Sequence, residues 1–165
     1  MTAVHPTPPA PSARERRTAW LLVLGQFGLL ALLVFLPHSD AWTLPLAITR
    51  TAEVAGAVGI VLMVVAGTAL GRGLTAAPLP NSHAELRTGG LYRFVRHPIY
   101  TGLLLLALAL MLTSGSLWTT AACAALVVLI NAKARWEERH LARRFPGYAA
   151  YAAGTPRFIP GPTRH

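Results

Sequence analysis

Two short polar segments contain the residues whose types and spacing could do chemistry. The first is Tyr92-Arg93-Phe94-Val95-Arg96-His97-Pro98-Ile99-Tyr100, in which Pro98 predicts the start of a helix because proline is tolerated in the first helical turn. A helix start presents free N–H groups and the positive end of the helix dipole. With Arg96, His97 and Tyr100 beside it, this helix start is expected to form an anion site.

The second segment, from Lys133 to Phe145, is expected to be the polar end of a helix that Pro146-Gly147 terminates. Glu137 shares a helical face with basic residues at i±3 and i±4 spacing, which is typical of a solvated, ion-paired surface. These basic residues are Lys133, His140 and Arg144. Glu138 instead lies on the stripe expected to face the protein, although Arg135 could neutralise it. The pattern therefore favours Glu138 as the ligand-binding carboxylate.

A third group of residues follows this helix. Tyr148 and Tyr151 precede the segment from Thr155 to Pro160, and together they form an aromatic, proline-punctuated tail that could anchor at a membrane interface or enclose a ligand. Arginines near a helix end are ordinary topology signals, but a histidine before proline and a tyrosine one turn later are not. His97 and Tyr100, with Glu138, are therefore the candidate catalytic residues.

Long apolar helices must position these segments. The chain has 165 residues, 53% of them hydrophobic, and a mean hydropathy of +0.46, which is too apolar for an ordinary soluble domain of this size. Four membrane spans are predicted, at about residues 20–36, 52–70, 95–113 and 117–134. The last two apolar runs are short, so both helices are expected to extend into polar flanks. The expected fold class is all-α, a polytopic membrane protein with a C-terminal helical hairpin.

The distribution of basic residues predicts the orientation in the membrane. Of the 15 Lys and Arg residues, only Arg50 lies outside the arm before the first span, the loop before the third and the segment after the fourth. Both termini and the two polar segments are therefore expected on the cytoplasmic side, with the bacterial inner membrane as the expected location. The net charge of +9 is interpreted as topology and not as a nucleic-acid surface.

The remaining segments support a simple domain organisation. Residues 1–17, rich in proline and then basic, are predicted to be a disordered tail, and residues 18–165 a single membrane-embedded domain. Small residues in the second span, such as Ala52/Gly56 and Ala55/Gly59, predict close helix contacts and leave room for a homodimer. Cys123, the only cysteine, lies in an apolar run away from other ligands, so no metal site is predicted.

Taken in order, these motifs resemble the isoprenylcysteine carboxyl methyltransferase family and its relatives, the phospholipid N-methyltransferases. The match runs from about Gly71 to Pro160. Its core, residues 90–102, is similar to the family's Gly-x-Tyr…Arg-His-Pro-x-Tyr-x-Gly signature, and the paired glutamates and the tail complete the order. The resemblance implies a pocket for S-adenosylmethionine whose expected contacts are Tyr92, Arg96, His97, Pro98, Tyr100, Glu137, Glu138, Tyr148 and Tyr151.

The implied activity is methyl transfer to a lipophilic acceptor in the lipid bilayer. The cofactor's carboxylate suits a helix start with basic neighbours, and its ammonium and sulfonium suit a carboxylate and aromatic faces. The methylated group could be a carboxylate or an amine. Two departures limit the likeness: Phe145-Pro146-Gly147 replaces the family's usual Phe-Gly, and eukaryotic carboxyl methyltransferases have additional N-terminal helices. Specificity for prenylated peptides therefore does not follow.

Two other functions stay open on the sequence alone. A membrane reductase of related architecture would use a nicotinamide cofactor, although the chain has no Gly-x-Gly-x-x-Gly fingerprint. A non-enzymatic membrane scaffold would use its basic flanks to bind anionic lipid. A scaffold gives no reason for the placement of His97 and Glu138, so a methyltransferase is the preferred interpretation.

Overall fold

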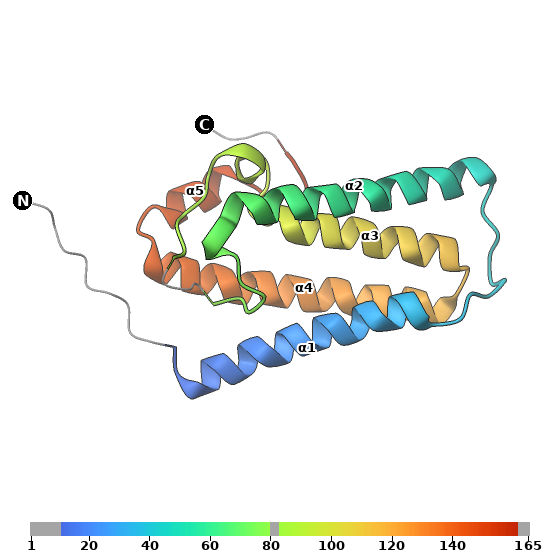
Figure 1. The fold of residues 1–165 in the computed structure, drawn as a ribbon, viewed down its shortest axis with the longest axis horizontal. Coiled ribbons are helices and arrows are strands. Elements are labelled where there is room, and N and C mark those ends of the chain that lie inside the picture. Colours follow the sequence, from blue (N-terminus) through green and yellow to red (C-terminus); the bar gives the residue numbers. More distant parts are fainter. Residues whose placement is uncertain (1–10, 80–82, 162–165) are drawn as a thin grey trace, which may run out of the picture.

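The computed structural model describes residues 11–79 and 83–161, and every regular element in them is helical, as predicted. The elements run in the order α1 (Ala13–Phe35), α2 (Leu46–Leu70), η1 (Gly71–Gly73), η2 (Gly90–Arg93), α3 (Pro98–Ser114), α4 (Leu117–Arg144) and α5 (Tyr148–Gly154) (Figure 1). The two η elements are short 3₁₀ helices.

The four long helices form an elongated bundle in which α2 packs along α3 and α1 along α4 (Figure 1). Leu103, Leu126 and Ile130 are among the buried residues at its centre. The outer faces of α1, α2 and α4 expose large apolar side chains such as Trp20, Val61 and Val128. These faces suit a lipid environment because such exposure would be unfavourable in water.

Three helices are long and apolar enough to cross a membrane by length and composition: α1, residues Leu46–Gly73, and α4. The third predicted span is shorter than expected, because α3 begins at Pro98 and has 17 residues. Its polar flank forms the separate 3₁₀ helix η2 instead of extending the helix. His97 has φ −126° and ψ 64°, outside the helical region, as expected for a residue before proline. The expected extension into the polar flank is confirmed for α4 and wrong for α3.

The first helix begins earlier than predicted. Ser12 and Glu15 form a capping box in which the Ser12 hydroxyl accepts from the Glu15 N–H and the Glu15 carboxylate accepts from the Ser12 N–H. Helix α1 therefore starts at Ala13, so the basic part of the predicted disordered tail, residues 13–17, is helical. Residues 1–10 of that predicted tail lie outside the described part of the chain.

Two glycines allow α2 and α3 to pack with their backbones nearly in contact. A Cβ atom on Gly59 would lie 2.4 Å from the carbonyl oxygen of Gly102, and one on Gly102 would lie 2.3 Å from that of Gly59. The close contacts predicted from small residues are thus formed inside one chain. Gly56 and Gly59 are buried against α3, so this face of the second span is not available to a partner. A homodimer stays a prediction, and the small residues of the second span no longer support it.

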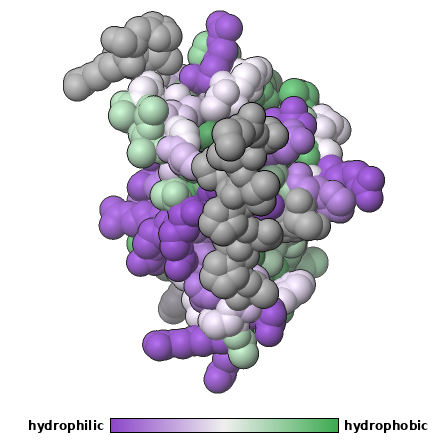
Figure 2. All heavy atoms as spheres, turned by 90° about the vertical axis from the view of Figure 1, so that its left-hand side faces the viewer, coloured by the Kyte–Doolittle hydropathy of each residue, from purple (hydrophilic) through white to green (hydrophobic). Residues whose placement is uncertain are grey.

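A hairpin at Gly115 connects α3 to α4 and returns the chain to the end of the bundle where α3 starts. Gly115 has φ +59°, and a Cβ atom there would lie 2.2 Å from the Ser39 carbonyl oxygen. The start of α3, the end of α4 and α5 consequently share one end of the molecule, on the left of Figure 1. We call it the polar end. Figure 2 shows hydrophilic side chains gathered there.

Candidate functional site

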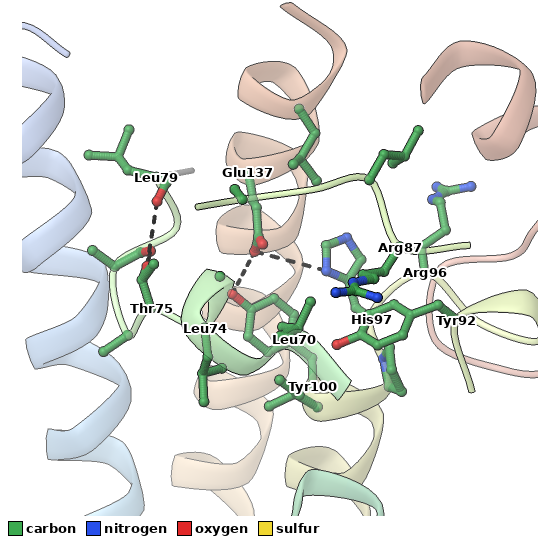
Figure 3. Close-up of a pocket in the computed structure, with 18 of the residues that line it drawn as sticks. Leu70, Leu74, Thr75, Leu79, Arg87, Tyr92, Arg96, His97, Tyr100 and Glu137 are labelled. Atoms are coloured by element: carbon green, nitrogen blue, oxygen red, sulfur yellow. Dashed lines mark hydrogen bonds and ion pairs between the residues drawn. The ribbon is translucent and has the colours of Figure 1, made fainter. Parts of the chain in front are cut away.

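A cavity of about 350 Å³ lies at the polar end, within the range of roughly 300–1,000 Å³ that is usual for small-molecule sites. Its wall combines Gln26 and Phe27 of α1, residues between 70 and 79 and from 83 to 87, Tyr92 with residues 96–100, and the polar end of α4 and α5 (Figure 3). The two polar segments singled out from the sequence therefore meet at one cavity.

Glu137 and Tyr100 lie in contact with each other on the wall of this cavity (Figure 3). The Tyr100 hydroxyl donates to Glu137 Oε2 at 2.8 Å, and His97 Nδ1 lies 3.9 Å from the same oxygen. The His97 and Tyr100 rings are stacked, with centroids 5.2 Å apart and an interplanar angle of 11°. The expectation that Glu137 lies on a solvated surface is wrong, because α3 covers the face of α4 that carries it.

Glu138 faces the protein, as predicted, but it is not part of the cavity wall. Its Oε1 accepts from Arg96 Nη2 at 3.0 Å and from Arg157 Nε at 2.9 Å, and its Oε2 accepts from Arg157 Nη2 at 2.6 Å. His97 Nε2 lies 3.2 Å from Oε1 and must donate, because a carboxylate only accepts. These contacts make Glu138 the centre of an ion-pair network that joins α4, the start of α3 and the tail.

Arg96 contributes its guanidinium to that network and to the chain that follows α5. Besides Glu138, it donates to the carbonyl oxygens of Ala152 and Thr155, at 2.7 and 2.5 Å. The expected anion site at the helix start is therefore largely filled by the protein itself. The N–H groups of Arg96 and His97 donate to the carbonyls of Pro156 and Arg157, and Pro98 has no N–H.

Three tyrosines complete the wall of the cavity. The Tyr92 hydroxyl donates to the Ala66 carbonyl at 3.2 Å, and the Tyr151 hydroxyl donates to the Tyr92 carbonyl at 2.5 Å. The Tyr148 hydroxyl is buried without a hydrogen-bond partner in the described residues. Burial raises the pKa of Tyr151 to about 12 and also raises the pKa of Tyr148, so both hydroxyls stay protonated donors at neutral pH.

Two polar residues of the cavity wall were not singled out by the sequence. Lys133 Nζ donates to Gln26 Oε1 at 2.6 Å and to the Ala76 carbonyl at 3.2 Å. Gln26 is the only amide in the apolar run of α1, and Lys133 lies one helical turn before Glu137. These two positions are the sequence features from which a contact between Gln26 and Lys133 at the site could have been predicted. The role of Arg157 depends on a tail that folds back over the start of α3, which no local pattern reports.

The described residues contain no group of three or more His, Cys, Asp or Glu side chains that could hold a metal ion. The ionisable groups of the cavity instead suit an organic ligand with charges of both signs. Glu137 presents a carboxylate, Arg87 presents a cation, and Tyr100, Tyr148 and Tyr151 present aromatic surface.

A family model described as phospholipid methyltransferase matches residues 49–147, more than half of the chain. The matched region includes nearly all of α2, both polar segments and the hairpin between them. The chain belongs to the phospholipid methyltransferase family. The resemblance seen in the arginine-histidine-proline-tyrosine and paired-glutamate motifs is thereby confirmed, and membership of this family indicates a membrane methyltransferase.

The chain is also similar to the cobalt-zinc-cadmium resistance protein CzcN of Cupriavidus metallidurans. It is 43% identical to this phospholipid methyltransferase family member over 76 residues. The match covers 46% of this chain and 35% of the relative, so it spans about a third of the relative's length.

Proposed function

We propose that this protein is an integral membrane methyltransferase that uses S-adenosylmethionine to methylate a lipophilic acceptor. One observation carries the proposal: the two motif segments meet at a single cavity, on whose wall Glu137 and Tyr100 lie in contact with each other. Arg96 and Glu138 support this cavity through their ion pair, and Glu137 is the carboxylate left to meet a positively charged ligand.

The cofactor supplies an activated methyl group, and its sulfonium becomes a neutral thioether when the methyl group moves to the acceptor. The protein's task is to position the two reactants in line and to exclude water. Glu137 and the tyrosine faces bind the positively charged part of the cofactor, and the Tyr148 hydroxyl supplies a donor that is otherwise unused. Arg87 lines the cavity, pairs with Glu85 at 3.1 Å and has a side chain that is 51% exposed, so its guanidinium can exchange that exposed partner for the cofactor's carboxylate.

The nucleophile of the acceptor is either a carboxylate or an amine. A carboxylate is reactive at neutral pH, whereas an ammonium must first lose a proton. One observation favours the amine: His97 Nε2 donates to Glu138, and the other ring nitrogen, Nδ1, lies 3.9 Å from Glu137 Oε2 on the wall of the cavity. His97 would then take the proton, as an amine N-methyltransferase requires, and Glu138 would fix its tautomer.

The polar end is assigned to the cytoplasm, with α1 to α4 as four spans of a bacterial inner membrane. The basic residues concentrate at this end, and the cofactor is made in the cytoplasm's aqueous phase. Impermeant maleimide labelling of cysteines introduced at the exposed positions His38 or Asp40, in a Cys123→Ala background, is expected to succeed from outside. Labelling of a cysteine at Ser12 from outside would contradict the assignment.

The direct test of the proposed function is ligand binding by the purified protein in a neutral detergent. S-adenosylhomocysteine, the demethylated product, is expected to raise the melting temperature. The free energy of unfolding should increase with the logarithm of the ligand concentration, by about 2.7 kcal/mol at one hundred times the dissociation constant. A nicotinamide dinucleotide is the matched control and should have no effect. Stabilisation by the dinucleotide alone would support a reductase, and stabilisation by neither ligand would support a scaffold.

A further inference from the structure

Lys133 is a buried cation on the wall of the cavity, and the methyltransferase chemistry proposed above does not use it. Lys133 is 3% exposed, and its side chain extends from α4 toward Gln26 of α1. In residues 11–79 and 83–161 no carboxylate lies within ion-pairing distance of its Nζ atom, in contrast to Arg96 and Arg157, which share Glu138. A buried ammonium is normally paired with an anion, so this one lacks its expected counter-charge.

The hydrogen bonds of Lys133 leave it able to bind a further acceptor. An ammonium has three N–H donors, and Gln26 Oε1 and the Ala76 carbonyl accept two of them. Both acceptors are neutral, so they satisfy two hydrogen bonds of the ammonium but do not balance its positive charge. The Nζ atom also lies 5.4 Å from the centroid of the Tyr100 ring, at the same cavity that Tyr100 shares with Glu137. The third donor is therefore at the cavity wall.

The position of Lys133 along α4 separates it from the proposed cofactor contacts. It precedes Glu137 by four residues, which is about 6 Å along the helix axis and farther from the polar end. Its partner Gln26 lies in the middle of α1, next to Phe27, whose side chain is 57% exposed among the apolar residues of that helix. The Lys133 side chain thus lies between the Glu137–Tyr100 pair and the lipid-facing surface.

We propose that Lys133, held by Gln26, binds a negatively charged group of the lipophilic acceptor, a phosphate or a carboxylate. The proposal rests on the proposed function and adds the chemical class of the second substrate. An acceptor bound in this way has its hydrocarbon chain along α1 near Phe27, its anionic group at Lys133 and its reacting atom near Tyr100. Lys133 is a specificity-determining residue that leaves cofactor binding to Glu137 and the tyrosines.

The first experiment uses the full-length protein in dodecyl maltoside with saturating S-adenosylhomocysteine. Three oleoyl probes of the same chain length are titrated by thermal shift: oleate, oleoyl lysophosphatidate and uncharged oleyl alcohol. At least one anionic probe is expected to bind tenfold more tightly than oleyl alcohol, and the tighter one distinguishes carboxylate from phosphate. Equal binding of all three probes by the wild-type protein would overturn the proposal before any variant is made.

The second experiment compares Lys133→Met with Arg139→Met, which removes the same charge from an exposed position of the same helix. Lys133→Met is expected to reduce the preference for the anionic probe to less than twofold, and Arg139→Met to leave it unchanged. Lys133→Arg, which keeps the charge, is expected to keep the preference. If both methionine variants lose it equally, the preference comes from the general positive charge of the protein, and the proposal is wrong.

Cofactor binding separates this proposal from the proposed function. Lys133→Met should change the affinity for S-adenosylhomocysteine by less than twofold. A tenfold loss of that affinity with unchanged lipid preference would place Lys133 in the cofactor site and overturn the inference. If the wild-type protein binds no S-adenosylhomocysteine but prefers anionic probes through Lys133, the proposed function fails and the anion site stands. If Lys133→Met does not fold, equal binding of the three probes by the wild-type protein still overturns the proposal, and Gln26→Leu, which removes the side chain that holds Lys133, is expected to lower the preference in its place.

Discussion

The Tyr100 hydroxyl donates a hydrogen bond of 2.8 Å to Glu137, and this contact joins α3 to α4 inside the cavity. The neighbouring Glu138 points away from the cavity and is held by Arg96 and Arg157. Two adjacent glutamates on one helix therefore have different surroundings. One is in contact with the space that a ligand would fill, and the other binds three parts of the chain together.

Glu137→Gln is expected to weaken binding of S-adenosylhomocysteine by roughly thirtyfold, about 2 kcal/mol, because the ligand's ammonium loses its carboxylate partner. The amide still accepts the Tyr100 hydrogen bond, so the melting temperature without ligand should change little. Isothermal titration calorimetry measures the affinity. An affinity within threefold of the wild type would show that the carboxylate does not contact the ligand.

Glu138→Gln should mainly destabilise the fold. The substitution leaves Arg96 and Arg157, whose side chains are 12% and 27% exposed, without their shared counter-charge. Breaking a buried ion pair in this way costs about 3 kcal/mol or more. Thermal unfolding followed by circular dichroism, with Glu137→Gln as the matched control, gives the comparison. Equal melting temperatures for the two variants would contradict the assignment of Glu138 to structure.

Tyr148→Phe and Tyr151→Phe are expected to change the stability of the ligand-free protein in opposite directions. Tyr151→Phe removes a hydrogen bond to the Tyr92 carbonyl and should cost about 1 kcal/mol. Tyr148→Phe removes a buried hydroxyl that has no partner in the described residues, so it should be neutral or stabilising. In the presence of S-adenosylhomocysteine, Tyr148→Phe should show a smaller melting-temperature shift than the wild type. An undiminished shift would remove Tyr148 from the binding site.

Gly102→Ala is expected to destabilise the protein by about 1–3 kcal/mol, because the added Cβ meets the Gly59 carbonyl, a backbone atom that cannot turn away. Gly28→Ala is the control in α1, where a Cβ has no neighbour within 4 Å and the better helix propensity of alanine should be neutral or favourable. Melting temperatures in the same detergent compare them. A Gly102→Ala variant as stable as Gly28→Ala would mean that α2 and α3 are not in backbone contact.

Local signals in the sequence predicted the features that depend on a few neighbouring residues. Pro98 marks the start of α3 and Pro146-Gly147 follows the end of α4, because a proline ring and a helix-ending turn act on the adjacent backbone. Helical spacing also predicted that Glu137 and Glu138 lie on different faces. It favoured Glu138 as the ligand-binding carboxylate, whereas Glu137 is the one that lines the cavity, because the face that meets the cavity depends on where α3 crosses α4.

The residues that the sequence analysis missed act across long separations in the chain. Lys133 meets Gln26 from 107 residues away, and Arg157 meets Asn131 and Glu138 through a tail that folds back. Periodicity within one helix carries no information about such partners. Arg96 was expected to present its charge to a ligand, but its guanidinium is used by Glu138 and two carbonyls, which is visible only when the tail is placed.

The tail at Thr155 to Phe158 has a consequence for how the protein is made. Its carbonyls accept from the Arg96 guanidinium, from the N–H groups of Arg96 and His97 and from the Thr101 hydroxyl, and its Arg157 pairs with Glu138. All of these partners precede it in the chain, so the ribosome synthesises them first. Until residues 155–158 have been synthesised, the start of α3 lacks the contacts that fix it. The wall of the cavity is therefore completed only after the helices that carry its other residues have been made.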